Sequence, residues 1–138
     1  ATTNPNNLVV LDEMTWRGRS TSGYSLNLAV QRSTTSTSEV TLKSFKVALS
    51  GEIQVQAYFG PQTSGTSVWI GFRKNGQLVW SSLASALGWT ANVTIPVSRD
   101  DLIEIRGYTT SSSVAMQLNQ VVVSYIPYRA GDFYNIVD

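Results

Sequence analysis

The chain has 138 residues, a usual length for one domain, and its net charge of +1 is not gathered into any block of like charges. This balance argues against a nucleic-acid partner, because such binding depends on clustered Lys and Arg, and no apolar run is long enough for membrane insertion. Cys and His are absent, which removes disulfides, thiol chemistry and the commonest general base and metal ligand. We therefore expect no catalytic residue, no metal site and no cofactor.

Alternation of apolar and polar residues predicts strands along most of the chain, after a flexible lead over residues 1–7. The alternation is regular over 24–30, 53–59, 93–97 and 102–106, and Pro96 favours an edge or a bulge in the third of these segments. Over 40–49 and 116–125 the phase changes by one residue, near Lys43-Ser44 and Asn119-Gln120. We expect a β-bulge at each of these two positions.

The segments between the strands are polar and rich in Ser, Thr, Gly or Pro, which indicates turns over 32–39, 60–67 and 109–113. Residues 81–89 predict a loop in preference to one helical turn. With no helix, repeat or linker in the pattern, the predicted fold is all-β: a single jelly-roll-like antiparallel β-sandwich spanning 1–138. Residues 127–138 are an aromatic C-terminal extension, which we expect to dock on a neighbouring molecule.

Asn75-Gly76 lies between two apolar runs and predicts a type I′ hairpin turn, which needs positive φ at both central residues. A two-residue turn there pairs Gly71 with Trp80. One face of the hairpin would then carry Val68, Ile70, Phe72 and Val79, and the other Trp69, Gly71, Arg73, Leu78 and Trp80. Both faces are too apolar for simple exposure to water.

The candidate contact residues come from this second face and from one further indole. Gly71 leaves room for an indole to lie flat on the sheet, so Trp69 and Trp80 fit three roles: core residues, a subunit interface, or a platform for a sugar ring. Trp89 follows a Gly-containing loop and fits either a binding residue or a lid over one end of the fold. The predicted ligand or subunit contacts are Trp69, Gly71, Arg73, Trp80 and Trp89.

Asp100, Asp101 and Glu104 form a local group of three carboxylates. Paired carboxylates can bind Ca²⁺ or cleave glycosides, but this group lacks the spaced oxygen ligands of the first and any partner that would raise a pKa for the second. We favour turn chemistry, in which an Asp side chain bonds nearby backbone.

From Leu42 to Ile126 the order of motifs resembles a β-sandwich module of bacteriophage tail and tail-fibre proteins, and more distantly the C1q/TNF-like jelly rolls. The motifs are Ser50-Gly51, the turn Lys74-Asn75-Gly76, and the turn Arg99-Asp100-Asp101-Leu102, where Asp100 stands in place of the family's Gly. The resemblance implies a non-enzymatic module of a virion, often trimeric and often in contact with host cell-surface glycan.

The predicted function is therefore a non-catalytic virion structural module, foremost a phage tail, tail-fibre or receptor-binding domain located on the extracellular particle. Its expected partners are two further copies in a homotrimer, other virion proteins and host glycan. Two alternatives stay open: a capsid decoration or stabilising protein, and a carbohydrate-binding module of a polysaccharide-degrading enzyme.

Overall fold

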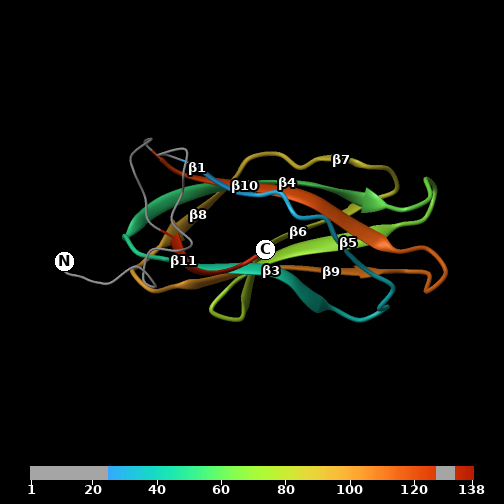
Figure 1. The fold of residues 1–138 in the computed structure, drawn as a ribbon, viewed down its shortest axis with the longest axis horizontal. Coiled ribbons are helices and arrows are strands. Elements are labelled where there is room, and N and C mark those ends of the chain that lie inside the picture. The colour runs from blue at the N-terminus through green and yellow to red at the C-terminus, as the bar shows by residue number, and fades with distance from the viewer. Residues whose placement is uncertain (1–24, 127–132) are drawn as a thin grey trace.

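The structure is a computed structural model that describes residues 25–126 and 133–138. The predicted lead over 1–7 and the first half of the C-terminal extension lie outside these residues. Figure 1 shows two layers of strands packed face to face. The predicted all-β antiparallel sandwich is confirmed. No helix long and apolar enough to cross a membrane is found among the described residues.

The first sheet has six strands. Gly51–Pro61 (β4) and Met116–Ile126 (β10) pair along most of their length at its centre. Ser25–Leu28 (β1) and Arg32–Thr34 (β2) pair with the free side of β10. Gly88–Trp89 (β7) and Val93–Val97 (β8) pair with the free side of β4. Pro96 therefore lies in an edge strand, as its missing N–H requires.

The second sheet has five strands in the order β11-β3-β9-β5-β6. They are Phe133–Val137 (β11), Val40–Val47 (β3), Leu102–Thr109 (β9), Val68–Lys74 (β5) and Gln77–Ala84 (β6). Phe133 is fully buried against Phe45 and Tyr125. This part of the extension thus docks on its own chain through β3. Its expected contact with a neighbouring molecule stays a prediction.

Alternating residues of both sheets meet in the core, where fully buried Ile, Val, Leu and Phe side chains fill the space between the layers. The expected bulges are present: the register shifts between Thr41 and Lys43 in β3, and between Leu118 and Gln120 in β10. The loop expected over 81–89 is wrong at both ends, because residues 81–84 continue β6 and Gly88–Trp89 form β7.

The Asn75-Gly76 turn has positive φ at both residues, 53° and 86°, as a type I′ turn requires. Lys74 pairs with Gln77 and Arg73 with Leu78, as predicted. The register then shifts, so that Phe72 faces Trp80 and Gly71 faces Ser81. The predicted pair of Gly71 with Trp80 is wrong, because a bulge at this point moves every later residue of β6 to the opposite face.

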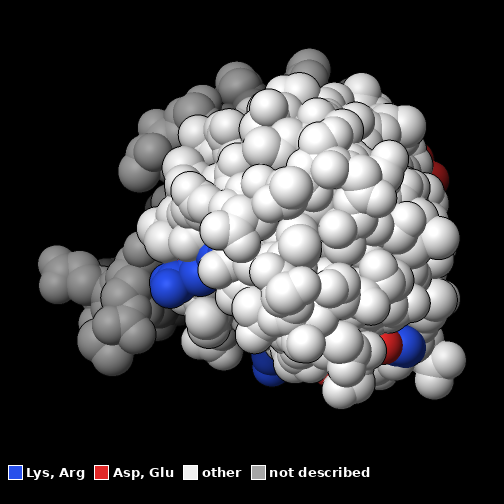
Figure 2. All heavy atoms as spheres, turned by 90° about the vertical axis from the view of Figure 1, so that its right-hand side faces the viewer, with Lys and Arg blue, Asp and Glu red and all other residues white. Residues whose placement is uncertain are grey.

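Figure 2 shows one end of the sandwich, where few charged side chains lie. Loops 62–67 and 110–115 are rich in Ser and Thr. Backbone hydrogen bonds join the first of these loops to its neighbours: Gln62 N–H donates to Ala115 O at 2.8 Å, and Gly65 N–H donates to Ser85 O at 2.8 Å.

Candidate functional site

The outer face of the six-stranded sheet carries amide side chains and two aromatic rings. Val55, Ala57 and Phe59 of β4 are buried in the core, so Gln54, Gln56 and Tyr58 lie on the other side. Residues directly opposite in paired strands share a face, and these pairs add Trp89, Gln120, Val122 and Asn27. We call Asn27, Gln54, Gln56, Tyr58, Trp89 and Gln120 the amide face.

The aromatic part of the amide face lies at the β7 edge. The rings of Tyr58 and Trp89 are 5.3 Å apart at 50°, and 48% of Trp89 is exposed. Thr90 fixes the backbone next to this indole, because its N–H donates to Ala57 O at 2.8 Å and its Oγ1 accepts from Ala57 N–H at 3.0 Å. Trp89 is thus a large exposed side chain on an anchored backbone.

Gly60 allows the chain to approach β4 just before Trp89. A Cβ at Gly60 would lie 2.5 Å from Leu87 Cα, so any larger residue would push the segment away. This close approach lets the chain cross from β6 of one sheet to β7 of the other. It also sets Trp89 beside Tyr58.

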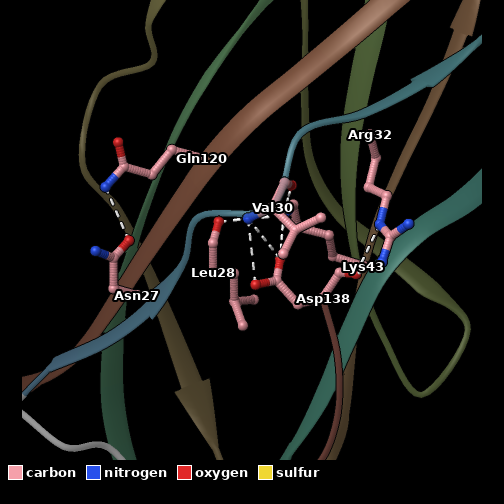
Figure 3. Close-up of polar contacts among 7 residues, drawn as sticks. All are labelled: Asn27, Leu28, Val30, Arg32, Lys43, Gln120 and Asp138. Atoms are coloured by element: carbon pink, nitrogen blue, oxygen red, sulfur yellow. Dashed lines mark hydrogen bonds and ion pairs between the residues drawn. The ribbon is translucent and has the colours of Figure 1, made fainter.

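The amides form a row next to these rings. Gln120 Nε2 donates to Asn27 Oδ1 at 2.8 Å (Figure 3), and Gln56 Nε2 donates to Thr90 O at 3.2 Å. A Gln or Asn side chain has two N–H donors and one acceptor oxygen. Each of these bonds uses only one N–H of the Gln that donates it. The fixed amides can therefore offer further donors and acceptors. The exposed Glu52 lies beyond Gln54 on the same side of β4, at the end away from Tyr58, and no Lys or Arg is among the residues that define the face.

The outer face of the five-stranded sheet has a different chemistry. The rings of Trp69 and Tyr108 are stacked, 5.1 Å apart at 14°. A Cβ at Gly71 would lie 2.2 Å from Trp69 Cη2, so the indole lies over this glycine. The expected space above Gly71 is present, but Trp69 fills it. Trp80 instead faces inward and stacks on Phe72, 4.8 Å apart at 30°.

Arg73 lies on the same outer face and is committed to ion pairing. Its Nε and Nη2 donate to the two carboxylate oxygens of Glu39 at 2.6 and 2.9 Å, and its Nη1 donates to Gly76 O at 2.9 Å. The hydrogen bond from Arg73 holds the pKa of Glu39 below its usual value, against an opposing effect of burial. Arg106 pairs with Glu104 at 3.0 Å.

The five predicted contact residues therefore divide into three places. Trp69, Gly71 and Arg73 lie together, Trp80 packs against the core, and Trp89 lies on the opposite sheet. The sequence analysis missed the amides and Tyr58. A signal was present in "QVQAYF", because alternating Gln, Gln and Tyr in a strand must share one face.

The carboxylates of residues 100–104 take part in turn and strand contacts, as favoured. Asp101 accepts from Ser98 N–H at 2.8 Å and from Asn75 Nδ2 at 2.9 Å. Burial raises the pKa of Asp101, but these hydrogen bonds outweigh it and the pKa is lowered. Asp100 has φ of 71° and accepts from the hydroxyl of Tyr134. Among the described residues, no three Asp or Glu side chains gather as a metal site would require.

The sequence analysis also missed a buried lysine in β3. Lys43 is fully buried and its Nζ donates to Leu28 O at 3.1 Å, to Val30 O and to Asp138 Oδ1 (Figure 3). Burial lowers the pKa of Lys43, and Asp138 partly offsets this. Since Leu28 belongs to one sheet and Lys43 to the other, the contact is a structural tie between the layers.

Comparison with known proteins finds likeness in structure alone. No protein-family model and no curated protein matches the sequence. The CBM36-1 domain of a multidomain xylanase from the hindgut metagenome of Trinervitermes trinervoides superposes with a TM-score of 0.50 at 10% identity, over 67% of this chain and 75% of that domain. Latent PorU from Porphyromonas gingivalis gives 0.51 at 13% identity, over 86% of this chain and 14% of PorU.

A carbohydrate-binding module of Cellvibrio mixtus lichenase 5A, solved with cellotriose, superposes with a TM-score of 0.38 at 13% identity, over 80% of this chain and 98% of the module. The likeness to the CBM36-1 domain, at 10% identity, shows a shared β-sandwich fold and no more. The site itself must be argued from the side chains above.

Proposed function

We propose that this domain is a non-catalytic module that binds a neutral glycan on its amide face. The observation that carries the proposal is the Tyr58–Trp89 pair, anchored at the end of a row of uncharged amides. The shared fold with the CBM36-1 domain of a xylanase supports it as well. The alternative of a carbohydrate-binding module thus has more support than a phage tail protein.

The chemistry of the amide face suits a sugar better than an ion. An exposed indole offers a flat apolar surface to the C–H face of a pyranose ring, while amides donate and accept hydrogen bonds with hydroxyl groups. Neighbouring strands are about 4.8 Å apart, so the row from Trp89 across to Asn27 spans roughly 14 Å. A short stretch of a glycan chain can lie along such a row.

The six residues that define the amide face carry no charge, which restricts the class of glycan that can bind there. A uronate or sulfated glycan brings anionic groups, which need a cationic partner when they leave water. The amide face has no Lys or Arg among its six residues. We therefore assign neutral glycans to it and expect acidic glycans to bind less tightly.

The test is binding of immobilised neutral and acidic glycans to the domain and to Trp89→Ala. We expect Trp89→Ala to lower the affinity for the bound neutral glycan at least tenfold, about 1.4 kcal/mol or more. The matched control is Trp69→Ala, which removes an indole from the opposite face and should leave binding unchanged. Equal loss in both variants, or no neutral glycan bound at all, would contradict the proposal.

The non-catalytic part of the proposal has its own measurement. Asp101→Ala should lower stability, because the carboxylate accepts two hydrogen bonds in its turn. We expect no hydrolysis of common polysaccharides by the original chain or by this variant. Turnover that disappears in Asp101→Ala would show an enzyme.

A virion location is a second proposal, which rests on the resemblance of the sequence motifs to phage modules. Two motifs of the resemblance to phage modules interlock: Asn75 N–H donates to Leu102 O at 2.8 Å, and Leu102 N–H donates to Asn75 Oδ1 at 2.9 Å. A tail or decoration role would use the same glycan or protein contacts on a particle. Antibody labelling of purified particles tests it, and particles that lack the chain would contradict it.

A further inference from the structure

We propose that β6 is an interface strand, which pairs edge to edge with β6 of a second copy of this chain. The contact would be antiparallel and two-fold, so that the two five-stranded sheets join into one. It involves a different sheet from the amide face and does not depend on glycan binding.

The first support is that β6 is a long edge strand with little of the usual protection. The other edge strands that the structure describes have five residues or fewer, and β8 also contains Pro96. β6 has eight residues and pairs with β5 alone within the described sheet. Its bulge lies near the turn, and Trp80–Ala84 pair regularly with β5. Proteins normally blunt such an edge with charge, Pro or a bulge.

The second support is the charge of the segment. Residues 75–98 contain no Asp, Glu, Lys or Arg, although 19 such residues occur in the chain. In a two-fold contact residue i meets residue j of the second copy and j meets i, so a charged edge would have to match opposite charges on either side of the axis. β6 carries no charge, so two copies can pair without bringing like charges together, while a charged partner strand would find no charge to pair with.

The backbone of β6 also has the required free groups. Asn75 N–H donates to Leu102 O, so the alternate residues 73, 71 and 69 of β5 direct their backbone towards β9. Their partners Ser81 and Leu83 on β6 then direct N–H and C=O to the open side. A second β6 supplies the matching donors and acceptors.

The side chains at this edge would gain from the same contact. Leu83 is 62% exposed and lies opposite Trp69 on the outer face. Leu78 and Val79 are 47% and 41% exposed. Pairing of two β6 strands would extend the apolar strip formed by Leu83 and Trp69 across the junction and remove part of it from water.

The experiment is the mass in solution by light scattering over a range of protein concentrations. We expect a dimer of the original chain, and a monomer for Leu83→Lys, because the contact would bring a lysine of each copy to the same junction on the outer face. Ser81→Pro is the second variant: it removes an N–H that points away from β5, so the hairpin keeps its own hydrogen bonds. Circular dichroism verifies that each variant is folded.

Leu49→Lys is the matched control, since Leu49 is an exposed leucine in the loop between β3 and β4, 39% exposed. It should remain a dimer. A monomer at every concentration, a trimer, or a dimer that Leu83→Lys and Ser81→Pro both leave intact would overturn the proposal. Trp89→Ala should not change the mass, so the result separates this interface from the glycan site.

Discussion

The two outer faces of the sandwich use their polar and aromatic side chains in different ways. On the five-stranded sheet, Arg73 and Glu39 form a two-pronged ion pair, and Trp69 lies on Gly71 with Tyr108 stacked against it. On the six-stranded sheet, Trp89 is exposed and the amides keep unused hydrogen-bonding capacity. On the first face the charged and aromatic side chains are engaged mostly with one another, with the buried Nε of Arg106 left without a partner, and the second face is open to a ligand.

This difference shows why an aromatic residue next to a glycine is not by itself a binding site. Trp69 and Trp89 are both on strands and both have an aromatic neighbour within 5.3 Å. The indole of Trp69 covers the sheet of its own chain, so its loss should reduce stability. The indole of Trp89 projects beside polar groups, so its loss should reduce affinity. Substitutions on the two faces can therefore be compared directly.

The largest effect on stability is expected from Gly71→Ser. A Cβ at this position would lie 2.2 Å from Trp69 Cη2, so the indole must move away and expose the sheet beneath it. We expect a loss of about 1–3 kcal/mol in the free energy of unfolding, measured with urea. Glycan affinity should not change. A variant as stable as the original chain would show that Trp69 is not held over Gly71.

A smaller effect is expected from Glu39→Gln. The substitution removes the carboxylate partner of Arg73 at a partly exposed site, so the loss should be below about 1 kcal/mol after screening by water. The original chain should lose the same contribution in acid. The pKa of Glu39 is lowered by folding, so the stabilisation is present above its usual value of 4.5 and is lost as the pH falls through the folded pKa.

Urea unfolding of both proteins at neutral and acidic pH measures this effect. The difference between the original chain and Glu39→Gln should shrink as the pH falls below 4.5. A difference that stays constant or grows in acid would show that the ion pair with Arg73 does not stabilise the fold.

Much of the fold could be predicted because a buried sandwich demands period-two alternation. The phase changes at Lys43 and Asn119 predicted bulges that the sheet register confirms. The bulge in β6 was not predictable in this way, because Leu78, Val79 and Trp80 are all apolar and the pattern fits two registers. That one-residue ambiguity reversed the face of Trp80 and changed its role.

The candidate site was less predictable, because the sequence analysis selected candidate contacts mainly by their indoles and did not select any amide side chain. Trp89 was selected, yet its partners come from β1, β4 and β10, which are far apart in the sequence and meet only in the sheet. The alternation of Gln54, Gln56 and Tyr58 predicts that their side chains share one face of the sheet. It does not predict whether another part of the chain covers that face. That depends on strand order, which the hydrophobic pattern alone does not specify.

The smallest effect on stability, with a clear effect on affinity, is expected from Gln120→Leu. Gln120 donates to Asn27 at 2.8 Å on a surface where both side chains meet water, so the loss in stability should stay within about 0.5 kcal/mol. The variant also removes amide groups that a sugar hydroxyl can use. One hydrogen bond contributes about 0.5–1.5 kcal/mol, so the affinity for neutral glycan should fall roughly 2- to 12-fold.

Glu39→Gln is the control from the other face and should bind glycan normally. The two variants should thus show opposite patterns: Glu39→Gln loses stability and keeps its affinity for glycan, while Gln120→Leu loses affinity and keeps its stability. Unchanged glycan binding in Gln120→Leu would show that the row of amides is not part of the binding site.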